Sequence, residues 1–82
     1  MKKNEVRHGN LVIYGGHQTT IDEKEIIHFI RFPDKYEPIP LTEEWLLKLP
    51  KNIKFPEWIK SLHELQNWYY WNNNKKELPI NL

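Results

Sequence analysis

The side chains that could bind a metal or carry out acid–base chemistry are four histidines and eleven acidic residues. No two histidines have the i, i+4 spacing of a helical zinc site or the short spacing of two ligands on one strand. The chain has no cysteine, which excludes thiolate metal sites, iron–sulfur clusters, disulfides and cysteine nucleophiles. The pattern therefore predicts no metal site and no cofactor. It leaves four surface or hydrogen-bonded imidazoles: His8, His17, His28 and His63.

Few hydroxyl side chains offer a nucleophile, and each has a simpler interpretation. Thr42 is placed to cap a helix, and Ser61 is interpreted as a filler within a helix. His63 and Glu64 are helix neighbours that point in different directions, so they are not expected to act as an orienting pair. With no activated nucleophile in view, we predict that the chain has no catalytic residues and is not an enzyme.

Four consecutive aromatic residues, 68–71, are the strongest sign of a binding surface. On a helix they point to every side, so at least one of them must face outward, and large exposed aromatic side chains are typical of interface anchors. An alternative is that the C-terminal tail, residues 78–82, folds back and covers them. On this basis the predicted partner-binding anchors are Tyr70 and Trp71, with Trp45 on an earlier helix as a second anchor. Lys75 and Lys76 are predicted to form the polar rim around them.

The charge balance bears on nucleic-acid binding. The net charge is +1 and the isoelectric point is 8.0, whereas nucleic-acid binders of this size usually exceed about 9. Nonspecific nucleic-acid binding is therefore disfavoured, although a basic face can exist within a balanced total. The residues that would contact a nucleic-acid backbone in that alternative are Lys2, Lys3 and Arg7.

These side chains need a fold to position them, and 82 residues suffice for one domain. The apolar run 11–14 is followed by two glycines, which favour a two-residue turn, so the sequence predicts a hairpin with a return strand over 17–21. Residues 22–24 are expected to form a second turn, and the alternation over 25–32 predicts a third strand. The N-terminal part should therefore be a small antiparallel sheet.

The remainder of the chain is expected to be helical. Prolines at 33, 38 and 40 predict an extended connector over 33–41 that cannot supply a central strand. Thr42 predicts the start of a short helix that reaches about Leu49. Pro56 predicts the start of a second, long amphipathic helix, which should end at the three asparagines 72–74.

The apolar stripe of the long helix is expected to form the core. Its members recur at helical spacing: Trp58, Leu62, Leu65 and Tyr69. We expect this stripe to pack against the sheet through Val12, Ile27 and Phe29. Residues 78–82 are expected to form an edge strand or a docked tail.

The predicted fold class is α+β: a three-stranded N-terminal antiparallel sheet, two helices and a short tail or edge strand. It forms a single domain over 1–82, with a sheet part (1–32), a proline-rich connector (33–41) and a helical part (42–82). No apolar run is long enough to span a membrane, and the Lys2-Lys3 start lacks an apolar segment typical of a secretion signal. We therefore expect a soluble cytoplasmic protein.

Three blocks occur in a recognisable order: NEVRHGNLV at 4–12, EPIPLTEEWLLK at 37–48 and HELQNWY at 63–69. They resemble a group of small uncharacterised phage and prophage proteins of Bacteroidota. In that group the second block leads into an aromatic-rich β region, which residues 50–61 replace here, and residues 71–78 depart from the usual ending. The chain is thus similar to a shortened, diverged member, and the resemblance carries no catalytic residues.

The resemblance implies a mobile-element accessory protein that binds a host macromolecule. We expect a phage-encoded inhibitor of a host defence system, and specifically an anti-CRISPR protein that binds an RNA-guided nuclease such as a type VI-B RNA-targeting effector or its guide-RNA complex. The partner would be a host protein, with RNA contact and homodimerisation through the aromatic C-terminal helix left open, and no membrane. The alternative is a nucleic-acid-associated or virion accessory module.

Overall fold

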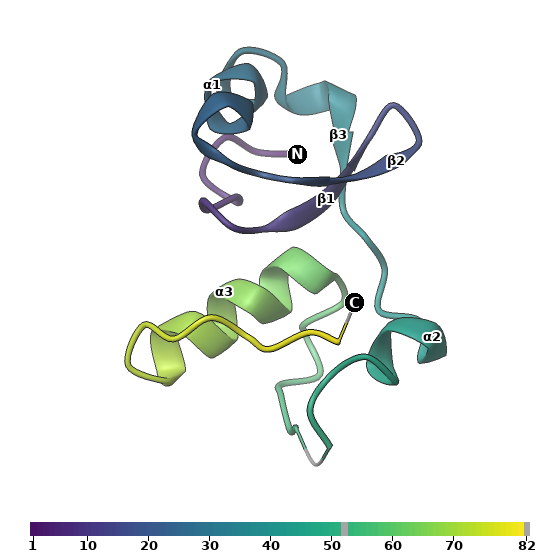
Figure 1. Cartoon of the computed structure of the whole chain (residues 1–82). Helices are drawn as coiled ribbons and strands as arrows, with labels where there is room; N and C mark the ends of the chain where they lie inside the picture. The colour runs from purple at the N-terminus through teal and green to yellow at the C-terminus, as the bar shows by residue number, and fades with distance from the viewer. Residues whose placement is uncertain (52, 82) are drawn as a thin grey trace.

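The computed structural model describes residues 1–51 and 53–81 and consists of a sheet with a helix on each face (Figure 1). The sheet has three antiparallel strands in the order β2-β1-β3: β1 (Leu11–Tyr14), β2 (His17–Thr20) and β3 (Tyr36–Glu37). The helices on its two faces are α1 (Glu23–Arg31) and α3 (Leu62–Asn72). The predicted α+β class, with a three-stranded antiparallel sheet and a long later helix, is confirmed.

The central strand β1 joins two hydrophobic cores because its side chains alternate between the faces of the sheet. One core lies on the α1 side and contains Val12, Ile21, Phe29 and Tyr36. The other, the α3-side core, contains Leu11, Ile39, Leu49, Ile59, Leu62, Leu65 and Leu78. Four apolar residues in a row fit this strand, since each of its faces packs against a core.

The predicted hairpin is confirmed. Tyr14 pairs with His17, so only Gly15 and Gly16 form the loop between β1 and β2. Their φ angles are 59° and 80°, in the left-handed region that glycine adopts without steric cost.

The third strand predicted over 25–32 is wrong, because residues 25–31 belong to helix α1 and Phe32 is its C-cap. Asp22 caps the helix: its Oδ1 accepts hydrogen bonds from the amides of Lys24 at 3.0 Å and Glu25 at 2.8 Å. The expected second turn over 22–24 is thus the helix start. Short apolar runs fit strand and helix periods alike, and here the cap decides in favour of the helix.

The third strand comes instead from the predicted connector. After a short 3₁₀ turn (Pro33–Lys35), β3 pairs with the free edge of β1, with Tyr36 opposite Tyr14. It remains an edge strand of two residues, as the flanking prolines require.

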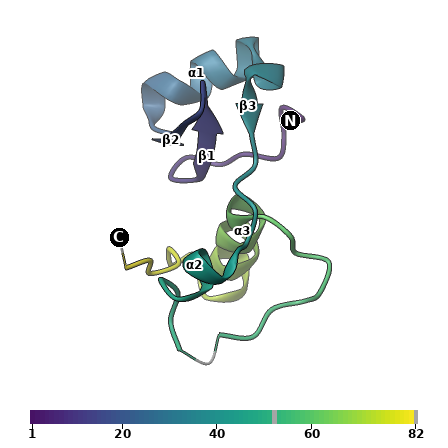
Figure 2. The same ribbon diagram turned by 90° about the vertical axis from the view of Figure 1, so that its right-hand side faces the viewer.

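Helix α2 (Glu43–Leu46) begins where predicted but ends earlier than the predicted Leu49. The chain continues from Leu46 to Leu49 as turns. Thr42 occupies the N-cap position, with extended backbone, but its hydroxyl makes no capping hydrogen bond. Figure 2 shows α2 next to α3, on the side of the sheet opposite α1, with a long loop leading from α2 to α3.

The long helix begins at Leu62 and not at Pro56. Ser61 and Glu64 form a capping box, with Glu64 Oε1 accepting a hydrogen bond from the Ser61 amide at 3.1 Å. The interpretation of Ser61 as a filler within the helix is therefore wrong, and residues 57–58 form a turn. The Ser-x-x-Glu pattern defines the helix start more strongly than the proline does.

The predicted stripe is correct for Leu62 and Leu65, which are fully buried, and Tyr69 packs against the α3-side core. Trp58 is 62% exposed and does not belong to it. The predicted partners on the sheet are also wrong. Val12 and Phe29 lie in the α1-side core, and Ile27 on the outer face of α1 is exposed.

The chain leaves α3 at the three asparagines, as predicted. Asn74 adopts φ 54°, a left-handed conformation that asparagine tolerates. The following tail forms no strand over 78–81 and docks along α3 (Figure 1), with Leu78 buried and the Asn81 amide donating to the Lys48 carbonyl at 2.8 Å. Leu82, the last residue of the predicted tail, lies outside the described residues.

Candidate functional site

The described residues form a groove of about 670 Å³ along α3. The helix supplies side chains at i, i+3, i+4, i+7 and i+8, which lie on one face of a helix: Glu64, Asn67, Trp68, Trp71 and Asn72. We call this pocket the tryptophan groove. Its volume lies within the range of about 300–1,000 Å³ typical of ligand sites.

The other walls of the tryptophan groove come from three further segments. Pro38 and Pro40 line it from the connector, Trp58 and Lys60 from the turn before α3, and Glu5 from the N-terminal segment. The connector is held there because Leu62 N donates to the Ile39 carbonyl at 2.8 Å and Leu41 N donates to the Lys60 carbonyl at 3.1 Å. The connector and the start of α3 are therefore tied to each other by backbone hydrogen bonds.

Two of the tryptophans are unusually accessible for such large apolar side chains. Trp58 is 62% exposed and Trp71 is 63% exposed, while Trp68 is half-buried and also packs against the α3-side core. Three indoles and two prolines thus form a largely apolar surface that solvent can reach.

His63 lies in the groove wall, and its side chain is only 3% exposed. Ser61 Oγ donates its single proton to Glu64 Oε1 at 2.7 Å, so the 3.2 Å contact between Ser61 Oγ and His63 Nδ1 requires the histidine to be the donor. In the neutral imidazole, Nε2 then carries a lone pair. It has no hydrogen-bond partner and lies 3.6 Å from Glu5 Oε2.

Burial lowers the pKa of His63 below its usual range, because the charged imidazolium loses its hydration. The carboxylates of Glu64 and Glu5 oppose this effect, and the N-terminal amino group adds to it. His63 is therefore neutral in the folded protein near pH 7.

This shift predicts that the protein loses stability in mild acid. The unfolded state binds a proton at His63 once the pH falls below about 6.5, whereas the folded state does not until a lower pH, so the free energy of unfolding should decrease between these values. Urea unfolding of the wild type, His63→Gln and His17→Gln at about pH 7 and about pH 5.5 measures this. His63→Gln should lose part of the dependence and His17→Gln, at an exposed position, should keep it. An equal pH dependence in all three proteins would contradict the assignment.

Ser61, His63 and Glu5 form a row that resembles a hydrolase triad in composition only. The Ser61 proton is directed to Glu64, and His63 Nδ1 is itself a donor toward Ser61, so the imidazole is not placed to accept the serine proton. The arrangement caps the start of α3.

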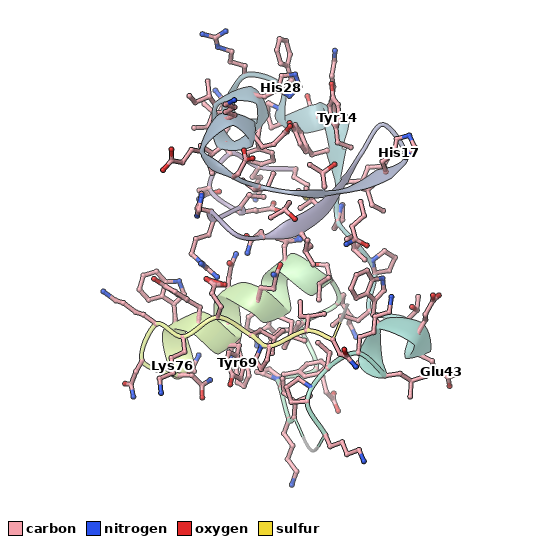
Figure 3. All side chains as sticks on the ribbon, viewed as in Figure 1. Tyr14, His17, His28, Glu43, Tyr69 and Lys76 are labelled. Atoms are coloured by element: carbon pink, nitrogen blue, oxygen red, sulfur yellow. The ribbon has the colours of Figure 1, made fainter. Side chains whose placement is uncertain are left out.

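The predicted anchors are not all brought together. Trp71 is the outward member of the aromatic run and lines the groove, with Lys75 Nζ 5.8 Å from the centre of its ring. Tyr70 is half-buried, and Trp45 packs against the α3-side core beneath Lys48. Lys76 is exposed in the loop after α3 (Figure 3), and the tail covers the α3-side core, not Trp71.

The basic residues predicted for a nucleic-acid backbone also separate. Lys2 and Lys3 are exposed, whereas Arg7 is engaged within the protein. Its guanidinium pairs with Glu77 and its Nε donates to Asn67 Oδ1 at 3.2 Å. The guanidinium carbon lies 3.8 Å above the centre of the Tyr70 ring. Arg7 thus connects the N-terminal segment to α3 instead of facing a phosphate.

The histidines lie apart from one another. His17 is on the hairpin and His28 on α1 (Figure 3), where its Nδ1 contacts the Tyr36 hydroxyl at 2.6 Å. That hydroxyl donates to Glu25 at 2.6 Å, and burial is the main reason why the pKa of Tyr36 is raised. Within residues 1–51 and 53–81, no group of three or more His, Asp or Glu side chains is placed to hold a metal ion.

Several groove residues were not found from the sequence. The sequence places Trp58 in the core stripe, and it indicates Trp68 only as a member of the aromatic run 68–71. His63 was treated as an isolated imidazole, and Glu5 lies far from α3 in the sequence. The pattern that could have revealed the groove is the Ser-x-x-Glu capping box at 61–64, because it shortens the helix and frees Trp58 from the stripe.

No family model matches this sequence, and comparisons with curated proteins and with solved structures gave no significant match. The resemblance to phage proteins therefore stays a prediction. None of the described helices has the length and hydrophobicity needed to cross a membrane.

Proposed function

We propose that this chain is a non-catalytic binding protein whose tryptophan groove holds a segment of a partner protein. The observation that supports this most strongly is the exposure of Trp58 and Trp71 in one groove, each more than three-fifths accessible, beside two prolines. Aromatic side chains at such positions bury a large area on binding and dominate the affinity of many interfaces.

The charges of the groove favour a protein over a nucleic acid. Its titratable lining includes the carboxylates of Glu5 and Glu64 against the single ammonium of Lys60, with His63 neutral. Carboxylates repel phosphates, and Arg7, the arginine of the predicted basic set, is paired with Glu77. Of the three residues predicted to contact a nucleic-acid backbone, Lys2 and Lys3 are the two that remain exposed for that role.

The three sequence blocks that resemble phage proteins meet around this groove. Glu5 comes from the first block, Pro38 and Pro40 from the second, and Asn67 and Trp68 from the third. Because each of the three blocks supplies residues to the groove, the resemblance supports the groove as the functional part of the molecule. We therefore retain, as the proposed biological role, inhibition of a host defence complex in the cytoplasm, with an RNA-guided nuclease or its guide-RNA complex as the partner.

Affinity capture from host lysate with groove variants tests the proposed function. Trp58→Ala and Trp71→Ala should each weaken retention of the partner by roughly thirtyfold, or about 2 kcal/mol, without a large change in thermal midpoint, because neither ring is buried in the free protein. Mass spectrometry and RNA extraction identify the bound species, and retention at high salt distinguishes apolar docking from phosphate binding.

Leu47→Ala is the matched control for these variants, because Leu47 is 86% exposed and lies outside the groove. It should retain the partner at wild-type strength. If both tryptophan variants also bind at wild-type strength, the groove is not the docking site. If capture yields mainly RNA that is lost at moderate salt, the nucleic-acid alternative replaces the proposal.

A further inference from the structure

We propose that the tryptophan groove receives an arginine side chain of the docked segment, with the guanidinium bound by His63 Nε2 and the carboxylate of Glu5. This inference rests on the proposed function and specifies the chemistry of the partner. It starts from an unsatisfied atom. Among the described residues, His63 Nε2 is the only buried side-chain nitrogen or oxygen without a hydrogen-bond partner.

Two acceptors face each other at this point of the groove. The lone pair of His63 Nε2 and the charged Oε2 of Glu5 are 3.6 Å apart, and neither can donate to the other while the imidazole is neutral. A buried acceptor without a donor destabilises the protein, because it has lost its hydrogen bonds to water and gained none in return. A donor with positive charge is the group that satisfies both acceptors and offsets the carboxylate.

Glu5 is placed so that a ligand can displace it from His63. Its backbone carbonyl is fixed, since Asn67 Nδ2 donates to it at 3.0 Å, whereas its side chain is 38% exposed. The carboxylate can therefore rotate outward and pair with an entering cation, which opens access to Nε2. The second carboxylate, Glu64, is already occupied by the capping box and contributes mainly through its charge.

The surroundings favour a guanidinium over an ammonium. Guanidinium groups stack on indole faces and offer several donors in a planar fork, whereas an ammonium is a compact, strongly hydrated charge. The molecule contains an internal example of this combination beside the same helix. Arg7 lies 3.8 Å above the Tyr70 ring and makes paired hydrogen bonds to the Glu77 carboxylate. The groove offers indoles and the Glu5 carboxylate in the same combination, without an arginine.

Titration of the ¹⁵N-labelled full chain with two short peptides tests the inference. The probes are acetyl-Gly-Arg-Gly-amide and the same peptide with citrulline, which has nearly the shape of arginine but no charge. The arginine peptide should bind in the millimolar range, shift the indole N–H signals of Trp58 and Trp71 and change the His63 Nε2 resonance. The citrulline peptide should bind roughly tenfold more weakly.

Protein variants provide a second arm that does not depend on the probe. Glu5→Gln should weaken the arginine peptide roughly tenfold, whereas Glu44→Gln, at an exposed position on α2, should leave its affinity unchanged. A lysine-containing peptide should bind more weakly than the arginine peptide. Thermal midpoints of both variants confirm that they remain folded.

Three results would overturn the inference: no binding of the arginine peptide, equal binding of the arginine and citrulline peptides, or a His63 Nε2 that already carries a proton near pH 7. In each case the proposed function is still judged separately, by the loss of partner binding in Trp58→Ala and Trp71→Ala. A short oligouridylate that shifts the same groove signals more strongly than the arginine peptide would contradict both proposals.

Discussion

Replacing Leu65 with alanine is expected to lower the free energy of unfolding by about 2–5 kcal/mol. Leu65 is fully buried in the α3-side core, where α3, β1, the connector and the tail meet, so the truncation leaves a cavity that rigid neighbours on several elements cannot fill. Because domains are stable by only about 5–15 kcal/mol, a chain this small should be close to unfolding at 37 °C. Urea unfolding monitored by tryptophan fluorescence measures the change.

Leu47→Ala is the matched control for this prediction. The same substitution at an 86% exposed position should change the stability by no more than about 0.5 kcal/mol. A Leu65→Ala protein with the wild-type midpoint would show that α3 presents another face to the sheet.

Replacing Gln66 with methionine is expected to destabilise the protein by about 2–6 kcal/mol, although the two side chains have nearly the same shape. Gln66 is 4% exposed, and its Oε1 accepts from the Leu11 amide at 2.8 Å while its Nε2 donates to the Gly9 carbonyl at 3.2 Å. Methionine leaves both backbone groups without partners, at about 1–3 kcal/mol each. Chemical unfolding and amide exchange at Leu11 both report this loss.

Gln18→Met provides the comparison, since Gln18 lies exposed on β2 and its replacement should be nearly neutral. If Gln66→Met and Gln18→Met have the same stability, the Gln66 amide is not what holds the N-terminal segment on α3.

The elements that were correctly predicted are those specified by local chemistry. The hairpin follows from two glycines after an apolar run, and the end of α3 follows from the asparagines. Both depend on backbone conformations that few residues adopt, so the sequence specifies them whatever the tertiary context.

The wrong predictions concern segments with two compatible interpretations. Residues 25–32 alternate like a strand, yet Ile26 and Phe29 are also spaced for the inner face of a helix, and the Asp22 cap selects the helix. Pro56 and Ser61 are both acceptable helix starts, and the capping box with Glu64 selects the second. In each case side-chain hydrogen bonds to the backbone decide between patterns that apolar periodicity leaves equivalent.

The groove could be predicted only in part. The aromatic run indicated an outward ring, and Trp71 is that ring, but its neighbours Trp58, Pro38 and Glu5 come from distant segments. Arg7 illustrates the same difficulty in reverse. As a sequence feature it is a free cation near the N-terminus, whereas in the structure it is paired with a glutamate 70 positions away. Contacts of this range depend on the whole fold.

The position of β1 between two cores has a consequence for how the chain is made. During synthesis the hairpin, α1 and β3 leave the ribosome first, and their mutual contacts are short in sequence, so this layer can assemble early. The face of β1 that packs against α3 is covered only after α3 has been synthesised, since the Gln66 amide that binds Leu11 is 55 positions further along the chain. Until then Leu11 and Ile13 are exposed on the nascent chain. We therefore expect α3 docking to be the late step of folding.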